Sequence, residues 1–166
     1  MANTVENKIF VAVREILKAS AIYEVTAGVP PVTTGYVKKV LDGVRGDIAE
    51  NAFPAVVLEP GITTEGDGTT TRRRLLRFNL RIVCFMECAD FDKQIVGDAN
   101  TKGILDFVND VKNALEAYPD LNYDGTGKRC NFFAFPEVKF EPELFPFRVA
   151  EITMRATVLT DGASMR

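Results

Sequence analysis

Apolar residues recur with helical spacing in two segments of the chain. In residues 4–22 the members of one apolar stripe are Val5, Ile9, Val13, Ile16 and Leu17. In residues 101–117, approximately, the members of a second stripe are Ile104, Val108, Val111 and Leu115. A period of 3.6 residues places each stripe on one face of a helix. We therefore predict two amphipathic helices.

Residues with capping side chains precede both segments. Asn3 lies three positions before Glu6, which is the spacing of a capping box with Asn in place of the usual Ser or Thr. Three residues before the second helix are able to cap it, namely Asp98, Asn100 and Thr101. Tyr118-Pro119 is expected to end the second helix, because the residue before a proline avoids the helical conformation.

Two other segments alternate between apolar and polar residues, as strands with one buried face do. In Arg73–Cys88 the shared face consists of Phe78, Leu80, Ile82, Cys84 and Met86. In Phe147–Thr160 it consists of Ala150, Ile152, Met154, Ala156 and Val158. At about 3.3 Å per residue the first strand reaches roughly 50 Å. A strand this long in a small protein is expected to project from the body toward another subunit.

The segments between these elements are less regular. Phe53–Pro60 is a short apolar run between prolines and is expected to be a strand buried on both faces. Residues 32–52 fit either a helical turn or a short strand. Residues 60–72 are rich in Gly and Thr, so we expect a flexible, exposed loop. Residues 161–166 are expected to be a loose tail.

The order of these elements predicts an α+β fold. Pairs of successive strands alternate with helices along the chain. This order favours a single mixed or antiparallel sheet with two helices on one face. A long projecting strand pair and the flexible loop complete this prediction. The 166 residues are expected to form a single domain, 1–166.

Composition narrows the classes of function. The formal net charge is −3, so no global basic field attracts nucleic acid. No apolar run reaches the roughly 18 residues that a membrane span needs, and the N-terminal residues lack the pattern of a secretory signal. We therefore expect a protein that is made in the cytosol and does not associate with a membrane.

The chain contains no histidine, which is the commonest general base and a frequent zinc ligand. The cysteines are Cys84, Cys88 and Cys130, and none of them forms a CxxC pair. A zinc site would need carboxylates as further ligands, so we interpret the cysteines as reduced, buried thiols. We expect no enzyme activity, no cofactor and no metal, although Asp, Glu, Lys or Tyr could still serve an enzyme without histidine.

Two other patterns resemble binding motifs incompletely. Gly125-Thr126-Gly127-Lys128 resembles the end of a phosphate-binding loop, but Arg129 follows where that motif has Ser or Thr. Several aspartates could suggest a metal site or an acid pair, namely Asp90, Asp92, Asp98, Asp106 and Asp110. Because the central glycine and terminal glutamate of a calcium loop are absent, we interpret these carboxylates as solvated.

Positive charge gathers near the start of the long strand. Residues 68–86 contain five arginines and no acid, among them Arg72, Arg73, Arg74 and Arg77. Residues 87–125 contain nine acids against three lysines. Three interpretations stay open: solvated surfaces, charge polarity for docking onto neighbouring proteins, and sequence-independent contact with DNA phosphates.

Half of the twelve phenylalanines lie in the proline-punctuated stretch 132–147. Phe140 and Phe147 are expected to fill the core. The alternation of Phe and Pro has no clear period, so the remaining rings cannot all point inward from one strand. Exposed aromatic rings are typical of interfaces, and we expect subunit contacts from Phe132, Phe133, Phe135 and Phe145.

In the order of its elements and in their residue patterns, the chain resembles the tail terminator (tail completion) proteins of long-tailed bacteriophages. The resemblance covers roughly residues 4–160. It is carried by the N-terminal helix, the Phe53-Pro54-Ala55-Val56-Val57 strand, the Arg-rich segment before a long amphipathic strand, the helix ending in Tyr-Pro, and the final strand Phe147–Met154.

The resemblance implies a structural virion protein at the head-proximal end of a phage tail, assembled in the host bacterial cytoplasm. Such proteins form a hexameric ring on the tail tube, stop its growth and offer a surface for head–tail joining. Their partners are copies of themselves, the tail tube protein and the head–tail connector or neck protein, while DNA passes the lumen as cargo. The resemblance implies contacts with tube, neck or lumen for the loop 60–72 and for Arg72, Arg73, Arg74 and Arg77. Another phage neck, tail or baseplate protein, or a non-viral oligomeric interaction domain, remains the alternative.

Overall fold

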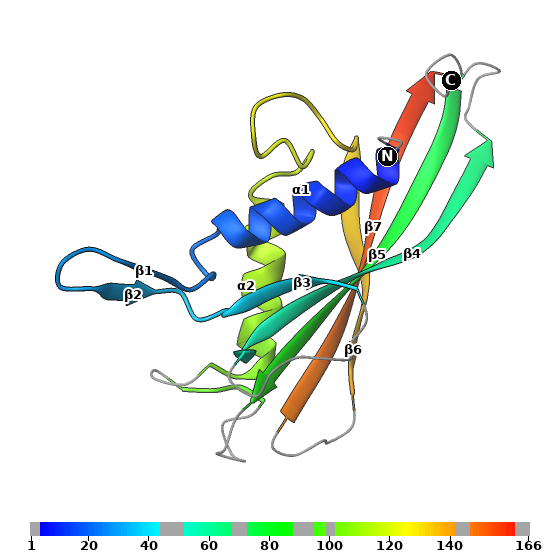
Figure 1. The fold of residues 1–166 in the computed structure, drawn as a ribbon. Helices are drawn as coiled ribbons and strands as arrows, with labels where there is room; N and C mark the ends of the chain where they lie inside the picture. Colours follow the sequence, from blue (N-terminus) through cyan, green and yellow to red (C-terminus); the bar gives the residue numbers. More distant parts are fainter. Residues whose placement is uncertain are drawn as a thin grey trace.

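The structure is a computed structural model, and it describes residues 4–43, 52–67, 73–87, 95–98, 102–141 and 147–161. Within these residues the chain forms two helices and seven strands. Both helices lie on one side of a five-stranded sheet, and a two-stranded hairpin extends away from them (Figure 1). The predicted α+β class and the two helices on one face are confirmed.

The first helix, α1, spans Val5–Ala19. Its N-cap is Thr4, whose hydroxyl accepts a hydrogen bond of 3.3 Å from the backbone N–H of Asn7. The prediction of Asn3 as the N-cap was therefore wrong by one position, and Asn3 itself lies outside the described residues. The apolar stripe faces inward as its period requires, and its most buried members are Ile9, Val13, Ile16 and Leu17.

The second helix, α2, spans Ile104–Glu116. It begins later than predicted, because its N-cap is Gly103 and not one of the three polar residues before it. The Asp106 carboxylate accepts a hydrogen bond of 3.4 Å from the Gly103 N–H. A Cβ atom at position 103 would lie 2.4 Å from the Ile95 carbonyl oxygen, so this close approach requires glycine.

The five-stranded sheet has the order β3-β4-β5-β7-β6. Its strands are β3 Lys39–Asp42, β4 Ala55–Asp67, β5 Arg73–Glu87, β7 Phe147–Asp161 and β6 Phe132–Phe140. β3 runs parallel to β4, and all other neighbours are antiparallel. The sheet is therefore mixed, with β3 at one edge and β6 at the other.

The main core lies between the helices and one face of the sheet. β5 and β7 supply alternate residues to it, as their patterns predict; examples are Leu80, Ile82, Ile152 and Met154, each at most 1% exposed. A smaller cluster on the opposite face is formed by Val57, Val83 and Val149, with Leu41 and Phe85 packed against it. We call the two sides of the sheet the helix face and the opposite face.

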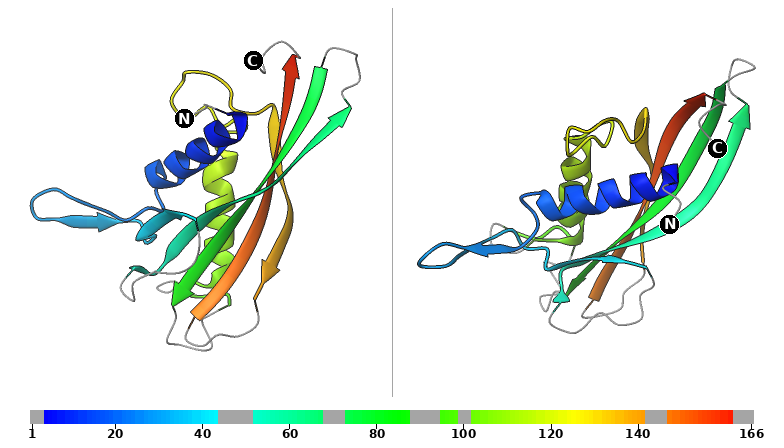
Figure 2. Two further views of the ribbon diagram at one scale, coloured as in Figure 1. Left: turned by 45° about the vertical axis from the view of Figure 1, so that its right-hand side comes forward. Right: turned by 45° about the horizontal axis from the view of Figure 1, so that its top comes forward.

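The predicted loop at 60–72 was wrong over residues 60–67, which continue β4. A register shift between Pro60 and Thr63 marks a bulge, so β4 keeps pairing with β5 on both sides of the proline. Residues 68–72 lie outside the described residues. The ends of β4, β5 and β7 extend together beyond the helices (Figures 1 and 2). Three strands project here, where the sequence predicted a pair.

Residues 25–34 form a hairpin that the sequence did not predict. β1 spans Val25–Ala27 and β2 spans Val32–Thr34, and they pair only with each other among the described strands. The hairpin points away from the helices and the sheet in every view (Figures 1 and 2). Of the undecided segment 32–52, the structure assigns β2 and β3 to strands and leaves 44–51 outside the described residues.

Candidate interaction surfaces

The arginines predicted as contacts occupy the beginning of β5. Arg77 is exposed on the opposite face of the sheet, paired in register with Thr64 of β4 and Thr157 of β7. Arg73 and Arg74 are the first residues of β5, at the end of the sheet that projects beyond the helices. Arg72 lies outside the described residues. The structure thus places Arg77 and the backbone of 73–74 on one projecting end.

Two further arginines share the opposite face with Arg77. Arg81 forms ion pairs with Glu59 of β4, at 2.8 Å, and with Glu151 of β7. Arg155 donates a hydrogen bond of 3.2 Å from Nε to Asn79. We call Arg77, Arg81 and Arg155 the arginine row. In the sequence, Arg77 and Arg81 are four residues apart, so they lie on the same face of a strand. That Arg155 lies beside them follows only from the register between β5 and β7.

The predicted aromatic contacts Phe132, Phe133 and Phe135 lie on β6, an edge strand. Phe132 is opposite Thr157 and is 57% exposed, whereas Phe133 is opposite Ala156 and turns to the helix face. The rings of Phe133 and Phe135 pack edge to face with centroids 5.5 Å apart and are half-buried against the core. We call Phe132–Phe135 the aromatic edge.

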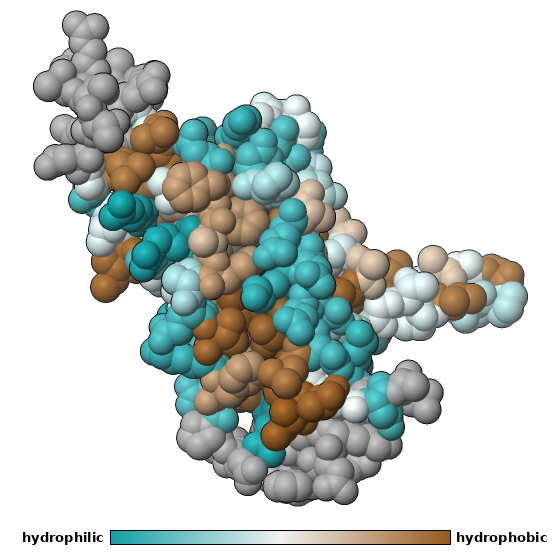
Figure 3. All heavy atoms as spheres, turned by 180° about the vertical axis from the view of Figure 1, so that it is seen from behind, coloured by the Kyte–Doolittle hydropathy of each residue, from teal (hydrophilic) through white to brown (hydrophobic). Residues whose placement is uncertain are grey.

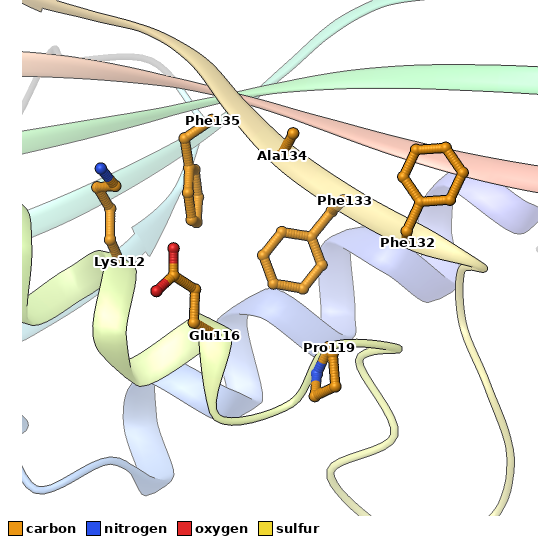
Figure 4. A pocket seen from close by; sticks show the side chains of 7 residues that line it. All are labelled: Lys112, Glu116, Pro119, Phe132, Phe133, Ala134 and Phe135. Atoms are coloured by element: carbon orange, nitrogen blue, oxygen red, sulfur yellow. The ribbon is translucent and has the colours of Figure 1, made fainter.

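A groove of about 430 Å³ runs between the aromatic edge and the C-terminal half of α2. Its walls are Phe132–Phe135 on one side and Lys112, Glu116 and Pro119 on the other (Figure 4). In Figure 4 the rings of Phe133 and Phe135 point from β6 toward α2. The Lys112 ammonium lies 5.6 Å from the centroid of the Phe135 ring, a cation–π distance. The groove is therefore aromatic inside and charged along its helical rim.

The other predicted phenylalanines have mixed outcomes. Phe140 was expected to fill the core, but it is 48% exposed at the far end of β6, so this prediction was wrong. Phe147 is half-buried, and its ring packs at a tilt against that of Phe53 with centroids 5.0 Å apart. Phe145 lies outside the described residues. A ring's place on an edge strand depends on which strand pairs beside it, and this is not visible in the sequence.

Two of the described aspartates form hydrogen bonds within the fold, whereas the candidates Asp90 and Asp92 lie outside the described residues. Asp110 accepts a 2.8 Å hydrogen bond from the Tyr36 hydroxyl and pairs with Lys102 at 3.0 Å. Asp124, in the segment that resembles a phosphate loop, accepts from the Thr126 N–H, which lowers the pKa of its carboxyl. Over the described ranges, no group of three or more His, Cys, Asp or Glu side chains could hold a metal ion.

Cys84 and Cys130 are free and buried, as predicted, while Cys88 lies outside the described residues. Burial raises the pKa of the Cys84 thiol far above its ordinary range. Burial and the nearby Asp120 carboxylate raise the pKa of Cys130 to about 12. Both thiols stay protonated near neutral pH and are therefore poor nucleophiles and poor metal ligands.

The hairpin at residues 25–34 is a candidate interaction surface that the sequence did not predict. Val25, Val29 and Val32 are 48%, 102% and 60% exposed. One signal was present in the sequence, because residues 25–37 contain no charged side chain. An uncharged stretch of that length suggests either burial or contact, but its valines have no strand or helix period to reveal which.

Each described helix is too short or too polar to cross a membrane. A scan of the sequence against models of protein families finds no match, and a search of curated proteins finds none either.

The fold itself has a match among solved structures. It aligns with a chain of a structure described as "Virion of native gene transfer agent (GTA) particle", with a TM-score of 0.50 and 15% sequence identity. The alignment covers 96% of this chain and 100% of that chain. The likeness therefore concerns the whole fold of both chains and not a shared fragment.

Proposed function

We propose that this protein is a structural component of a phage-like virion that caps the head-proximal end of a tail tube. In this proposal it forms a homo-oligomeric ring, with six subunits, that stops tube polymerisation and provides the surface for head–tail joining. The observation that carries the proposal is the full-length likeness to a chain of a gene transfer agent virion. The order of elements that resembles tail terminator proteins agrees with it.

The surfaces of the chain fit a subunit that contacts neighbours on several sides. The aromatic edge, the valine-rich hairpin and the projecting ends of β4, β5 and β7 occupy different parts of the molecule (Figures 1 and 2). Exposed apolar rings and valines are typical of interfaces. A ring built from identical subunits requires two different surfaces on each subunit, since its contacts run head to tail.

The proposal assigns partners to these surfaces. Arg72, Arg73, Arg74 and Arg77 contact the tail tube protein, the neck protein or the lumen, and Phe132, Phe133, Phe135 and Phe145 contact neighbouring subunits. DNA passes the ring as cargo and meets arginines only through its phosphates. The protein carries out no chemical reaction, needs no cofactor and is located in the tail of the virion after assembly in the host cytoplasm.

The same likeness is compatible with another structural protein of such a particle. The matched structure is described as a whole virion and not as one of its components. A neck, tube or baseplate protein of the same kind of particle would therefore give the same likeness. These alternatives differ in where the protein lies along the tail.

Two measurements test the proposal. Light scattering after size exclusion, at several concentrations and two salt levels, should detect a closed species near six times 18.3 kDa. Electron microscopy of tail tubes that polymerise with and without the protein should show shorter tubes capped at one end when it is present. Tubes of unchanged length with no bound ring would contradict the terminator role. Labelled protein at the distal end would favour a baseplate role instead.

A further inference from the structure

The hairpin of residues 25–34, which we call the valine hairpin, has an apolar face that nothing covers within the described part of the molecule. Val25 is opposite Thr34 and Ala27 is opposite Val32, so these four side chains share one face. Thr26 and Thr33 share the other face, where their hydroxyl oxygens lie 2.9 Å apart. All six strand residues are exposed. A two-stranded ribbon is marginally stable alone, so an uncovered apolar face indicates a partner.

The base of the valine hairpin is firmly held. The backbone N–H groups of Tyr36 and Val37 both donate 2.8 Å hydrogen bonds to the Ile22 carbonyl, and Glu24 donates to Val37 at 2.9 Å. Val37 is 1% exposed. At Gly35, whose φ is +76°, a Cβ atom would lie 2.1 Å from the Tyr23 carbonyl oxygen. The hairpin is therefore attached at a fixed angle, which lowers the entropy cost of docking.

The opposite edge of the sheet offers a surface of matching chemistry. β6 pairs with β7 on one side, and no described strand pairs with its other side. Its second half carries features that protect edge strands, namely a bulge at Pro136 and the charged pair Glu137 and Lys139. The first half, the aromatic edge, has neither charge nor proline and borders the groove along α2.

Charge and position both indicate a second copy of the chain as the partner. The valine hairpin brings no charge that would be buried unpaired in an aromatic groove. In Figure 3 the projecting arm shows none of the deep teal of charged residues. The hairpin leads into β3 at one edge of the sheet, whereas the aromatic edge is at the other. Two unlike surfaces on opposite edges produce a head-to-tail contact, which closes into a ring if the rotation permits.

We propose that the valine hairpin of one copy docks on the aromatic edge and the groove beside α2 of the next copy. This inference rests on the proposed ring and names the contact that closes it. The apolar face of Val25 and Val32 lies across the aromatic edge, where it contacts the exposed Phe132 ring and the mouth of the groove beside Phe133 and Phe135. The side chains of Thr26 and Thr33, on the other face of the hairpin, remain exposed to solvent.

Complementary variants test this contact. Val32→Asp should prevent the hairpin from docking while the aromatic edge stays intact. Phe132→Glu should prevent the aromatic edge from accepting a hairpin while the hairpin stays intact. Both side chains are more than half exposed, so neither change disturbs the core. Each variant alone should remain monomeric in light scattering, with the concentration for half-association raised at least about tenfold. An equimolar mixture should form a dimer of about twice 18.3 kDa, since one functional hairpin and one functional edge remain.

Matched controls lie next to each changed residue. Thr33→Asp places the same charge on the other face of the hairpin, and Phe140→Glu places it at the far end of β6. Both should associate as the unchanged protein does. Circular dichroism should show the same helix content and melting temperature for all four variants.

Other outcomes overturn the contact in distinguishable ways. Val32→Asp protein that forms complete rings but no longer binds tubes would assign the hairpin to the tube protein. If the mixture of variants fails to form a dimer, the contact does not run from hairpin to edge. If the unchanged protein stays monomeric at every concentration, docking on a second copy is excluded. The proposed function fails separately, when the protein does not cap tubes.

Discussion

A Cβ atom on Gly61 would lie 2.7 Å from the backbone oxygen of Asn79 on the neighbouring strand. Gly61 lies in the bulge of β4, where the register with β5 shifts between Pro60 and Thr63. The Asn79 side chain donates a 3.0 Å hydrogen bond to the Ile62 carbonyl in the same bulge. This glycine is thus a requirement of strand pairing, although in the sequence it resembles a loop residue.

Replacing Gly61 should therefore destabilise the protein. Gly61→Ala forces β4 away from β5 and should lower the free energy of unfolding by about 1–3 kcal/mol, measured by urea denaturation. Gly66→Ala is the control, because a Cβ there would meet Leu75 at an ordinary 3.8 Å. It should change the stability by less than about 0.5 kcal/mol. Equal effects of the two changes would argue against the close approach at Gly61.

Arg81 neutralises two carboxylates on the opposite face of the sheet. Its partners Glu59 and Glu151 have side chains only 17% and 13% exposed, whereas that of Arg81 is 42% exposed. Arg81→Met leaves two partly buried carboxylates without their shared cation and should cost about 1 kcal/mol of stability. Denaturation in low and high salt measures this, and the difference from the unchanged protein should shrink in high salt.

Arg77→Met serves as the control for this change, since Arg77 is exposed on the same strand and face. It should alter the stability by less than about 0.5 kcal/mol. A loss at Arg77 as large as that at Arg81 would mean that general charge on this face, and not the paired carboxylates, determines the effect.

The buried thiols make the protein sensitive to alkali. The pKa of Cys130 is raised to about 12, whereas an unfolded thiol ionises with a pKa of about 8.5. Between these values only the unfolded chain releases the proton, so the free energy of unfolding falls as the pH rises. Each such thiol lowers the free energy of unfolding by up to about 1.4 kcal/mol per pH unit in this window. Below this window its ionisation does not change the stability.

Urea denaturation at several pH values from 8 to 11 checks this dependence. Cys130→Ala should make the fall of stability with pH less steep, whatever its effect on stability at pH 8. Cys84, whose pKa is raised by burial in the same direction, accounts for part of the remaining slope. An identical slope in the variant would show that Cys130 ionises equally in the folded and unfolded chains.

Charge reversal tests the arginines at the start of β5. The triple change Arg72→Glu, Arg73→Glu and Arg74→Glu should block capping of the tail tube or head–tail joining, because it reverses the charge presented to the partner. Electron microscopy of tubes and infectivity or transfer assays of particles measure the two steps. Unchanged assembly would remove this segment from the candidate contacts.

A matched charge change elsewhere completes that test. Lys8, Lys18 and Lys128 are exposed and lie in α1 and in the loop after α2. Changing all three to Glu gives the same change in net charge at a different place. Normal assembly of this variant together with failure of the arginine variant would locate the contact on the projecting strand end.

The elements that the sequence predicted well are those whose signal is local. α1, α2, β5 and β7 each bury one side, and the period of their apolar residues depends only on the geometry of the helix or strand. The prediction failed where this signal is missing. Residues 60–67 are rich in Gly and Thr yet continue β4, because pairing with β5 compensates for their poor strand propensity.

The candidate surfaces were predictable only in part for the same reason. The sequence determined that the stretch 132–147 contains more aromatic rings than one strand can bury. The strand order makes β6 an edge strand, so that Phe132 is exposed while the adjacent Phe133 packs on the core. The packing of the fold also leaves the uncharged residues 25–34 away from the helices and the five-stranded sheet. Exposure depends on which distant segments lie alongside, and this is a property of strand order and register that no local pattern encodes.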